Sequence, residues 1–214
     1  MKKISRKQVN NFWSKRAQIK DARISTHFKQ DDTHLYDLDL IKKYATSKSN
    51  VLDVACGTCF LTNQLADNVA YIKGTDKFGE FLEHCQVSKK FEVQQADILT
   101  YQDKRKYDLI LMFGIITYFD DDDTALIYKR YKKLLTKGGV LIVKHQCGLE
   151  NDVLIDKFSE QIGDKYQANY KHVNKDLSIL KKHFANVELI DIYPSRLNVW
   201  ENTHFFAFVC KNSD

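Results

Sequence analysis

A short apolar segment followed by a turn of small residues constrains this chain more than any other stretch. Residues 51–54, Val-Leu-Asp-Val, have the β-branched and apolar character of a buried strand. Residues 55–59, Ala-Cys-Gly-Thr-Cys, are all small, and small side chains let a backbone pass close to a ligand. Phe60, Leu61 and Leu65 then follow at helical spacing. The sequence therefore predicts a strand, a tight loop and a helix whose first N–H groups point toward whatever the loop holds.

The length of the chain predicts one domain covering residues 1–214. It has 214 residues, of which 43% are apolar, and it contains a single proline, so it can bury a substantial core without long flexible linkers. Its apolar runs fall well short of the roughly 18 residues that a membrane helix needs. No apolar stretch follows the basic first residues, so a signal peptide is not expected.

The five cysteines are scattered and odd in number, and with no export signal they are interpreted as reduced thiols in the cytoplasm. Cys56 and Cys59 have C-x-x-C spacing, which occurs in zinc sites and redox pairs. No second cysteine pair and no neighbouring histidine completes four zinc ligands, so the sequence predicts no metal.

The charge of the chain is mildly positive and evenly spread. The formal net charge is +5, and the lysines occur singly or in small pairs such as Lys132-Lys133. Nucleic-acid-binding faces usually carry denser basic patches. The composition therefore disfavours a nucleic-acid partner and favours an ordinary solvated surface.

Strand-like and helix-like segments alternate along the chain. The predicted strands are residues 51–54, 69–76, 91–95, 107–113, 140–143, 187–193 and 204–210. Helices are predicted near residues 5–19, at 34–44, after the acidic run 120–123, and in two segments within 150–184. Residues 107–113 are nearly all apolar, as in a central parallel strand covered on both faces. Only a short connection separates the last two strands, so they should pair antiparallel.

An acid at the end of the second predicted strand is a candidate ligand for a ribose. Asp76 lies 19 positions after Gly57, close to the spacing at which dinucleotide-binding units place an acid for ribose hydroxyls. A helix N-cap is the simpler alternative, because Asp often begins helices. Loop and spacing agree here, and they favour ribose binding.

The ordered set of these features resembles the class I methyltransferases that use S-adenosylmethionine. Their first motif is an acid followed by three small residues at alternating positions, usually glycines, and Asp53, Ala55, Gly57 and Cys59 stand at those positions. Ala55 and Cys59 replace two glycines, and Cys59 crowds the place of the methionine part. Asp97 after the third strand and Gly138-Gly139 before the fifth also match the family.

The resemblance implies an α/β, Rossmann-like seven-stranded methyltransferase fold. Its sheet would be mostly parallel with an antiparallel C-terminal hairpin strand, and helices would cover both faces. Residues 34–214 would form the core. Residues 1–33 would form a helical extension, which is either a lid or a helix simply packed on the domain.

The resemblance also implies S-adenosyl-L-methionine as cofactor. Asp97 and Ile98 would meet the adenine, Phe78 would lie against its ring, and Phe113 ends the strand that borders the methyl group. The candidate cofactor-binding residues are Asp53, Ala55, Cys56, Gly57, Asp76, Lys77, Phe78, Asp97, Ile98, Phe113, Trp13 and Arg16. His145, expected just past the fifth strand, is the candidate general base because its reference pKa of about 6.5 suits proton abstraction near neutral pH.

The acceptor is predicted to be a small molecule or a sugar-like group, methylated on oxygen. Residues 114–119 lack the Pro-Pro motif of amine-methylating enzymes that act on bases. Candidate substrate-binding residues are Tyr36, Tyr118, Arg196 and Trp200. Two alternatives stay open: methylation of RNA or protein, and a non-catalytic nucleotide-binding module, which the replaced glycines at Ala55 and Cys59 suggest.

Overall fold

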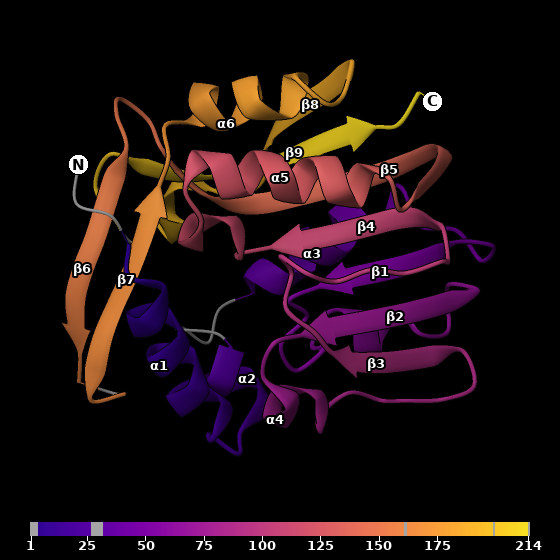
Figure 1. Ribbon diagram of the computed structural model, residues 1–214, viewed down its shortest axis with the longest axis horizontal. Coiled ribbons are helices and arrows are strands. Elements are labelled where there is room, and N and C mark those ends of the chain that lie inside the picture. The colour runs from indigo at the N-terminus through magenta and orange to yellow at the C-terminus, as the bar shows by residue number, and fades with distance from the viewer. Residues whose placement is uncertain (1–3, 27–31, 161, 199, 214) are drawn as a thin grey trace.

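A computed structural model describes residues 4–26, 32–160, 162–198 and 200–213. A seven-stranded sheet forms its centre, with the strand order β3-β2-β1-β4-β5-β9-β8 (Figure 1). Its strands are β1 (Asn50–Val54), β2 (Tyr71–Asp76), β3 (Phe91–Gln95), β4 (Tyr107–Phe113), β5 (Leu135–Gly148), β8 (Asn186–Asp191) and β9 (Thr203–Lys211).

Strands β1 to β5 pair in parallel, whereas β9 pairs antiparallel with both β5 and β8. The closing pair β8–β9 is therefore the antiparallel hairpin that the sequence predicts. The central strand β4 has an almost fully buried apolar run, as its continuous hydrophobicity predicts. The predicted Rossmann-like seven-stranded fold is confirmed.

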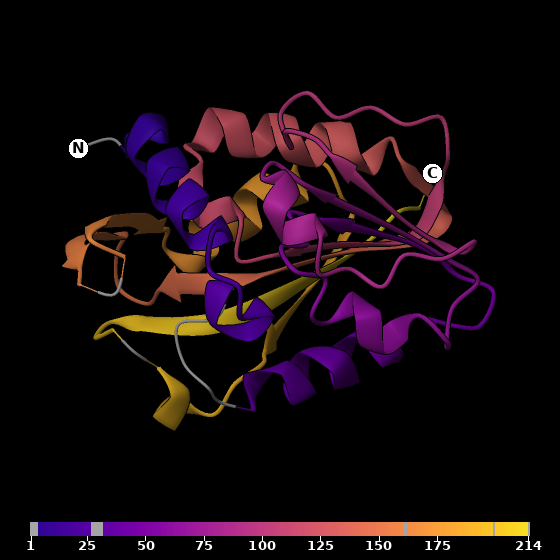
Figure 2. The same cartoon turned by 90° about the horizontal axis from the view of Figure 1, so that it is seen from below.

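Helices cover both faces of the sheet (Figure 2). On one face α3 (Thr33–Lys42) and the 3-10 turn η1 (Thr62–Leu65) bury apolar side chains against β1, β2 and β4. On the other face α5 (Asp121–Lys132) and α6 (Val173–Lys181) pack against β4, β5 and β9. Alternate residues of each strand point to opposite faces, so each face has its own core.

Helix α5 shows how local sequence sets an element. The Asp120 side chain caps its first turn by accepting from the Asp123 amide at 3.0 Å, and three aspartates in that turn suit the positive end of the helix dipole. Its buried face carries Ile127, Tyr128 and Tyr131. The acidic run thus supplies the N-cap and the first turn of the helix that was predicted to follow it.

The N-terminal segment forms two helices that lie over the end of the sheet. Helix α1 (Arg6–Ala17) begins at the N-cap Ser5, and the short α2 (Ala22–Thr26) follows it. Thr26 ends α2, and residues 27–31 after it lie outside the described residues. None of the described helices has the length and apolar character needed to cross a membrane.

The first of the two helical segments predicted within residues 150–184 is wrong. The segment forms strands β6 (Val153–Ser159) and β7 (Asp164–Tyr170), an antiparallel hairpin beside the main sheet, next to α1 (Figure 1). Leu154 and Phe158, which helical spacing assigned to a buried stripe, are 39% and 64% exposed. Ile155, between them, is buried instead. Successive side chains of a strand point to opposite faces, so Ile155 faces the opposite way from Leu154. The later helix of the segment is α6.

The predicted boundaries of two further elements are also wrong. The helix expected from Phe60 onward is only the 3-10 turn η1, and it begins at Thr62, three residues after the left-handed Cys59. Strand β5 starts at Leu135 and continues to Gly148, so it includes Lys144, His145 and Gln146, which were expected beyond it. Pairing with β9 as far as Thr203 explains that extension.

Two smaller elements connect the strands near the site. They are the helical turn α4 (Gly79–Leu82) after β2 and the 3-10 turn η2 (Ile116–Tyr118) after β4. A further 3-10 turn, η3 (Ser195–Leu197), lies between β8 and β9. Helix α3 also departs from the expected stripe, since Leu35 is 51% exposed and Asp37 is buried.

The interpretation of all five cysteines as reduced thiols is wrong for two of them. Cys59 and Cys85 form a disulfide, and Cys56, Cys147 and Cys210 are free. The pairing could not be read from spacing, because 26 residues separate the partners. The fold brings Cys85, just after α4, back to the loop that follows β1.

Candidate functional site

A cavity of about 700 Å³ opens at the carboxyl ends of β1, β2 and β4. Val54, Asp76 and Phe113, the last residues of these strands, border it. Its opposite wall comes from α1 and the β6–β7 hairpin. In open α/β sheets this edge is where ligands bind, and the volume suits a ligand of drug size.

Asp76 is held in a fixed orientation by backbone amides. Its Oδ2 accepts from the Gly57 amide and its Oδ1 from the Phe78 amide, each at 2.9 Å. Burial raises the pKa of Asp76, although these amides act in the opposite direction. Each carboxylate oxygen keeps a further lone pair, so Asp76 can accept from a pair of vicinal hydroxyls.

Asp53 lies buried at the same corner, where the ionisation of its carboxyl group is unfavourable. Its Oδ2 accepts from the Thr62 hydroxyl at 3.0 Å. Burial raises the pKa of Asp53 to about 7, with the Thr62 hydrogen bond opposing and the charge of Asp76 adding to the rise. A cationic group bound in this part of the cavity would favour the ionised carboxylate.

The loop between β1 and η1 has a strained backbone. Ala55, Gly57 and Cys59 have φ values of 56°, 53° and 55°, in the left-handed region that favours glycine. A Cβ on Gly57 would lie 2.7 Å from the Thr26 methyl group of α2, so α2 packs directly on the loop. The Thr58 hydroxyl also donates to the Ala22 carbonyl at 3.0 Å.

The next part of the cavity wall comes from the turns after β2 and β3. The Lys77 ammonium lies 3.0 Å from a carboxylate oxygen of Asp97, whose other oxygen accepts from the Leu99 amide at 2.9 Å. Partial burial acts to raise the pKa of Asp97, but these two partners hold it below its ordinary value. Phe78 and Ile98 line the cavity on either side of this pair.

Three tyrosines line the opposite part of the cavity. The Tyr166 and Tyr170 hydroxyls lie 3.2 Å apart on β7, and Tyr118 of η2 packs edge-on to Trp13 with ring centroids 5.9 Å apart. Burial raises the pKa of all three phenols, so they remain protonated near neutral pH. The Lys157 ammonium lies 4.4 Å from the Trp200 ring centroid at the same end.

A charged triad lies between these two parts of the wall. The Lys144 ammonium of β5 contacts Oδ2 of Asp37 at 2.8 Å and the Tyr193 hydroxyl at 2.7 Å. That hydroxyl donates to Oδ1 of Asp37 at 2.7 Å. All three residues border the cavity, and their mutual contacts neutralise one another's charge.

His145 borders the cavity but lies in a buried network. Its side chain is 1% exposed, and its Nε2 lies 2.7 Å from Oδ2 of Asp176 on α6. The Lys171 ammonium lies 3.9 Å from the other oxygen of Asp176. Nδ1 of His145 has no hydrogen-bond partner among the described residues.

Two groups of side chains in the described part of the chain are close enough to share a metal ion. They are Cys56, Cys59 and Cys85, and His145, Cys147 and Asp176. The disulfide occupies two sulfurs of the first group. The Lys171 ammonium beside Asp176 opposes a second cation in the other group.

Most residues predicted to bind the cofactor border the cavity, with Trp13 on the wall opposite the others. They are Asp53, Ala55, Cys56, Gly57, Asp76, Lys77, Phe78, Asp97, Ile98, Phe113 and Trp13. Arg16 does not border the cavity: it is buried and donates to the Ser25 and Ile24 carbonyl oxygens, and its guanidinium carbon lies 5.7 Å from the Trp13 ring centroid. It fastens α1 to α2.

The predicted substrate-binding residues divide in two. Tyr118 and Trp200 border the cavity, whereas Tyr36 and Arg196 do not. Tyr36 packs edge-on to Tyr193, with ring centroids 5.9 Å apart.

Sequence reasoning missed Tyr166 and Tyr170, because the hairpin was read as a helix. Their spacing of four also fits one face of a strand. Nothing in the sequence pairs Lys144 with Asp37, which lies 107 positions away.

A family of known proteins matches the part of the chain that runs from β1 into β5. Residues 51–139, from β1 into β5, match a family model described as a methyltransferase domain. A curated relative from Bacillus cereus, described as an uncharacterized methyltransferase, is 26% identical over 119 residues, which are 54% of this chain and 55% of the relative. A relative from Bacillus mycoides matches to the same extent. The chain thus spans about half the length of the curated relatives it matches.

Solved structures share the fold at low sequence identity. The N-methyltransferase NodS from Bradyrhizobium japonicum, in complex with S-adenosylhomocysteine, has a TM-score of 0.71 and 13% identity, covering 97% of this chain and 100% of its own. A DhpI complex with S-adenosylhomocysteine has a TM-score of 0.74 and 14% identity, covering 98% and 100%. Phosphoethanolamine N-methyltransferase 1 from Haemonchus contortus has a TM-score of 0.73 and 17% identity, covering 96% and 49%.

Proposed function

We propose, from the premise that this chain carries a class I S-adenosylmethionine-dependent methyltransferase domain, that it transfers a methyl group from S-adenosylmethionine to a small polar acceptor. The match of residues 51–139 to the methyltransferase domain supports the premise. The observation that carries the proposal is the corner where Asp76, fixed by two amides, stands beside the left-handed loop of β1.

The residues of this corner fit an adenosyl ligand. Asp76 would accept from the ribose hydroxyls, and Asp97 from the adenine amino group, with Phe78 and Ile98 against the ring. Asp53 would face the cationic end. When bound, the cofactor supplies a methyl group already activated by a positive sulfur. The protein then contributes mainly alignment, which is worth about 7–11 kcal/mol of barrier for well-oriented groups.

For the acceptor, we propose a small molecule or sugar-like group methylated on oxygen. Tyr118, Tyr166 and Tyr170 support it, because protonated phenols donate hydrogen bonds to acceptor oxygens. The wall formed by α1 and the β6–β7 hairpin lies opposite the strand ends, so a small acceptor would be held between two walls of the cavity.

Transfer to an amine is the second candidate. Aromatic rings at the same end of the cavity can attract a cationic acceptor, as the Lys157 ammonium over the Trp200 ring shows for a cation of this chain. Two solved structures with the same fold are titled N-methyltransferases. The two candidates differ in the atom that receives the methyl group.

His145 remains the proposed general base. Its free Nδ1 would take a proton while Asp176 holds Nε2 at 2.7 Å. The burial of His145 and Asp176 would also suit a purely structural role. Turnover and its pH dependence in a His145 variant distinguish the two roles. A His145→Gln variant that keeps full turnover, with unchanged pH dependence, would remove it from the mechanism.

Calorimetry tests the proposed cofactor first. We expect S-adenosylmethionine and S-adenosylhomocysteine to bind and NAD not to bind. An acceptor screen that follows S-adenosylhomocysteine release, with product mass and fragmentation, then separates oxygen from nitrogen acceptors. Binding without release for any acceptor favours a non-catalytic module, and acceptor affinity that falls steeply with salt favours RNA.

A further inference from the structure

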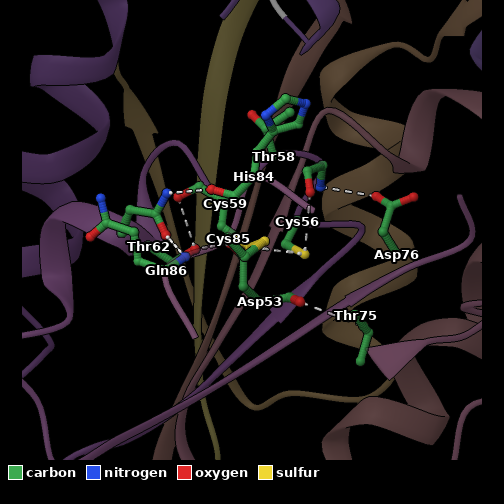
Figure 3. The surroundings of a disulfide bond; sticks show 12 residues. Asp53, Cys56, Thr58, Cys59, Thr62, Thr75, Asp76, His84, Cys85 and Gln86 are labelled. Atoms are coloured by element: carbon green, nitrogen blue, oxygen red, sulfur yellow. Dashed lines mark hydrogen bonds between the residues drawn. A yellow bond between two sulfur atoms is a disulfide. The ribbon is translucent and has the colours of Figure 1, made fainter. Parts of the chain in front are cut away.

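The left-handed loop carries a cysteine where its conformation favours glycine. Cys59 has a φ of 55°, and its side chain is fully buried. A non-glycine residue in this region costs on the order of 1 kcal/mol. Its side chain has a clear use, since it forms the disulfide to Cys85 (Figure 3).

The disulfide joins two segments that border the cofactor corner. Cys59 ends the loop after β1, and Cys85 lies three residues beyond α4, the turn that follows Lys77 and Phe78. Asn63 strengthens the same junction: its side chain donates to the His84 carbonyl at 3.3 Å and accepts from the Gln86 amide at 2.9 Å. The loop is therefore anchored from behind, away from the cavity.

A third sulfur lies beside this bond. Sγ of Cys56 is 3.6 Å from Sγ of Cys59, and Cys56 itself borders the cavity (Figure 3). Gly74 of β2 leaves space for the group, because a Cβ there would lie 3.0 Å from the Cys56 sulfur and 3.4 Å from the Cys59 sulfur.

We propose that the Cys59–Cys85 disulfide, with the Cys56 thiol beside it, is a thiol–disulfide exchange site and that the state of this bond controls cofactor affinity. The Cys59–Cys85 bond holds the loop in its binding conformation, and reducing it frees the loop to leave that conformation. The inference rests on the proposed function for the identity of the ligand. It gives a physical reason for the cysteine at a position where the family usually has glycine.

The chemistry needs a thiol reductant, and a dithiol supplies it. One dithiol sulfur attacks the protein disulfide, its second sulfur completes the exchange, and the dithiol leaves as a cyclic disulfide while Cys59 and Cys85 each gain a proton. Within the protein, the Cys56 thiolate attacks Sγ of Cys59, so a Cys56–Cys59 bond forms, the Cys59–Cys85 bond breaks, and Cys85 leaves as a thiolate that takes up a proton.

Without an external reductant, the attack of Cys56 on Cys59 is slow. Burial raises the pKa of the Cys56 thiol, and the nearby charges of Asp53 and Asp76 raise it further. The thiol form therefore dominates near neutral pH, and the thiolate is the attacking species. The cluster thus stays as Cys59–Cys85 until an external reductant acts.

The test measures S-adenosylhomocysteine affinity by calorimetry in the two redox states of the full chain. The protein is oxidised with glutathione disulfide or reduced with dithiothreitol, and thiols are counted by alkylation and mass spectrometry after denaturation. Three alkylated cysteines are expected in the oxidised state and all five in the reduced state. We expect reduction to weaken binding about tenfold, equivalent to about 1.4 kcal/mol.

Three variants test whether the disulfide itself, and not another cysteine or the loop sequence, determines the affinity. Cys85→Ser, which does not change the cavity wall, should bind as weakly as reduced protein in both conditions. Cys59→Gly should bind as tightly as oxidised protein in both conditions, because glycine adopts the left-handed φ without a crosslink. Cys210→Ala, a buried control in β9, should keep the full redox response.

Equal affinity in both states, with the thiol counts verified, would overturn the inference. Alkylation of all five cysteines in the oxidised sample would also overturn it. Absence of binding in either state would instead contradict the proposed function. The wild-type measurement needs no variant, so a folding defect in Cys85→Ser or Cys59→Gly leaves the test intact.

Discussion

The two sides of the cavity are built in different ways. The cofactor side, defined here as the loop 53–59 with Asp76 to Phe78 and Asp97 to Leu99, comes from strand ends and short turns. It carries three left-handed residues and two buried acids with raised pKa values. The acceptor side, defined as α1, η2 and the β6–β7 hairpin, is a packed aromatic surface.

The difference shows where binding and stability conflict. On the cofactor side, the buried acids and the left-handed backbone destabilise the fold, and contacts with the proposed cofactor would offset this cost. On the acceptor side, the same rings that face the cavity also join α1 to β7, as in the Phe12–Tyr166 contact with centroids 5.3 Å apart. Substitutions should therefore raise stability on the first side and lower it on the second.

The largest expected effect is a gain of stability in Asp53→Asn. Raising the pKa of Asp53 from 3.8 to about 7 makes its ionisation in the folded state unfavourable by up to about 4 kcal/mol. The folded state binds more protons than the unfolded state between these values, so wild-type stability falls as pH rises through that window. Denaturant titrations should show the gain of the variant growing from pH 4 to 7 and constant above.

The control for this prediction is Asp67→Asn, at a fully exposed side chain. It should leave the free energy of unfolding unchanged at every pH. A loss of stability in Asp53→Asn at pH 8 would show that other groups of the fold stabilise the charge of Asp53. It would contradict the claim that substitutions on the cofactor side raise stability.

Asp76→Ala should have the next largest effect, on binding. Removing the carboxylate frees the Gly57 and Phe78 amides and deletes the acceptor proposed for the ribose, so S-adenosylhomocysteine affinity should fall about 30- to 100-fold, or about 2–3 kcal/mol. Calorimetry measures this directly, with Asp67→Ala as the matched control. Unchanged affinity would remove Asp76 from the site.

Tyr166→Phe probes the acceptor side with a smaller effect. The buried hydroxyl contacts that of Tyr170 at 3.2 Å, and its loss should destabilise the fold by about 1 kcal/mol. The KM for the acceptor should rise several-fold while cofactor affinity stays within twofold. A comparable loss of cofactor affinity would mean that the two sides do not act separately.

Phe158→Ser should have the smallest effect on folding. The Phe158 side chain borders the cavity but is 64% exposed, so the free energy of unfolding should change by less than about 0.5 kcal/mol. Thermal denaturation measures this change in stability. A drop of several degrees in melting temperature would show that the β6–β7 hairpin depends on this ring for its packing.

The two sides also differ in how far the sequence predicted them. Strand β1, its small-residue loop and Asp76 lie within 27 residues, and local spacing is enough to place them together. The acceptor side joins residues 6–17 to 153–170, which only the tertiary fold brings together. Periodicity misread the hairpin, because short apolar runs fit both a helix and a strand. Likewise, no spacing rule connects Cys59 with Cys85.

The contacts between charged side chains could not be predicted from local sequence patterns either. His145 was placed past a strand that in fact continues to Gly148, and its partner Asp176 comes from α6, 31 positions away. Strand ends depend on what pairs beside them, and here β9 extends the pairing. Sequence reasoning thus predicted residues that line one wall of the cavity, and the tertiary fold supplied the other wall.

A crystal structure with S-adenosylhomocysteine tests the central claim most directly. The account predicts the ribose hydroxyls on Asp76, the adenine between Phe78 and Ile98, and the sulfur facing the tyrosines of η2 and β7. Density for the ligand outside this cavity, or a ribose that makes no contact with Asp76, would contradict it.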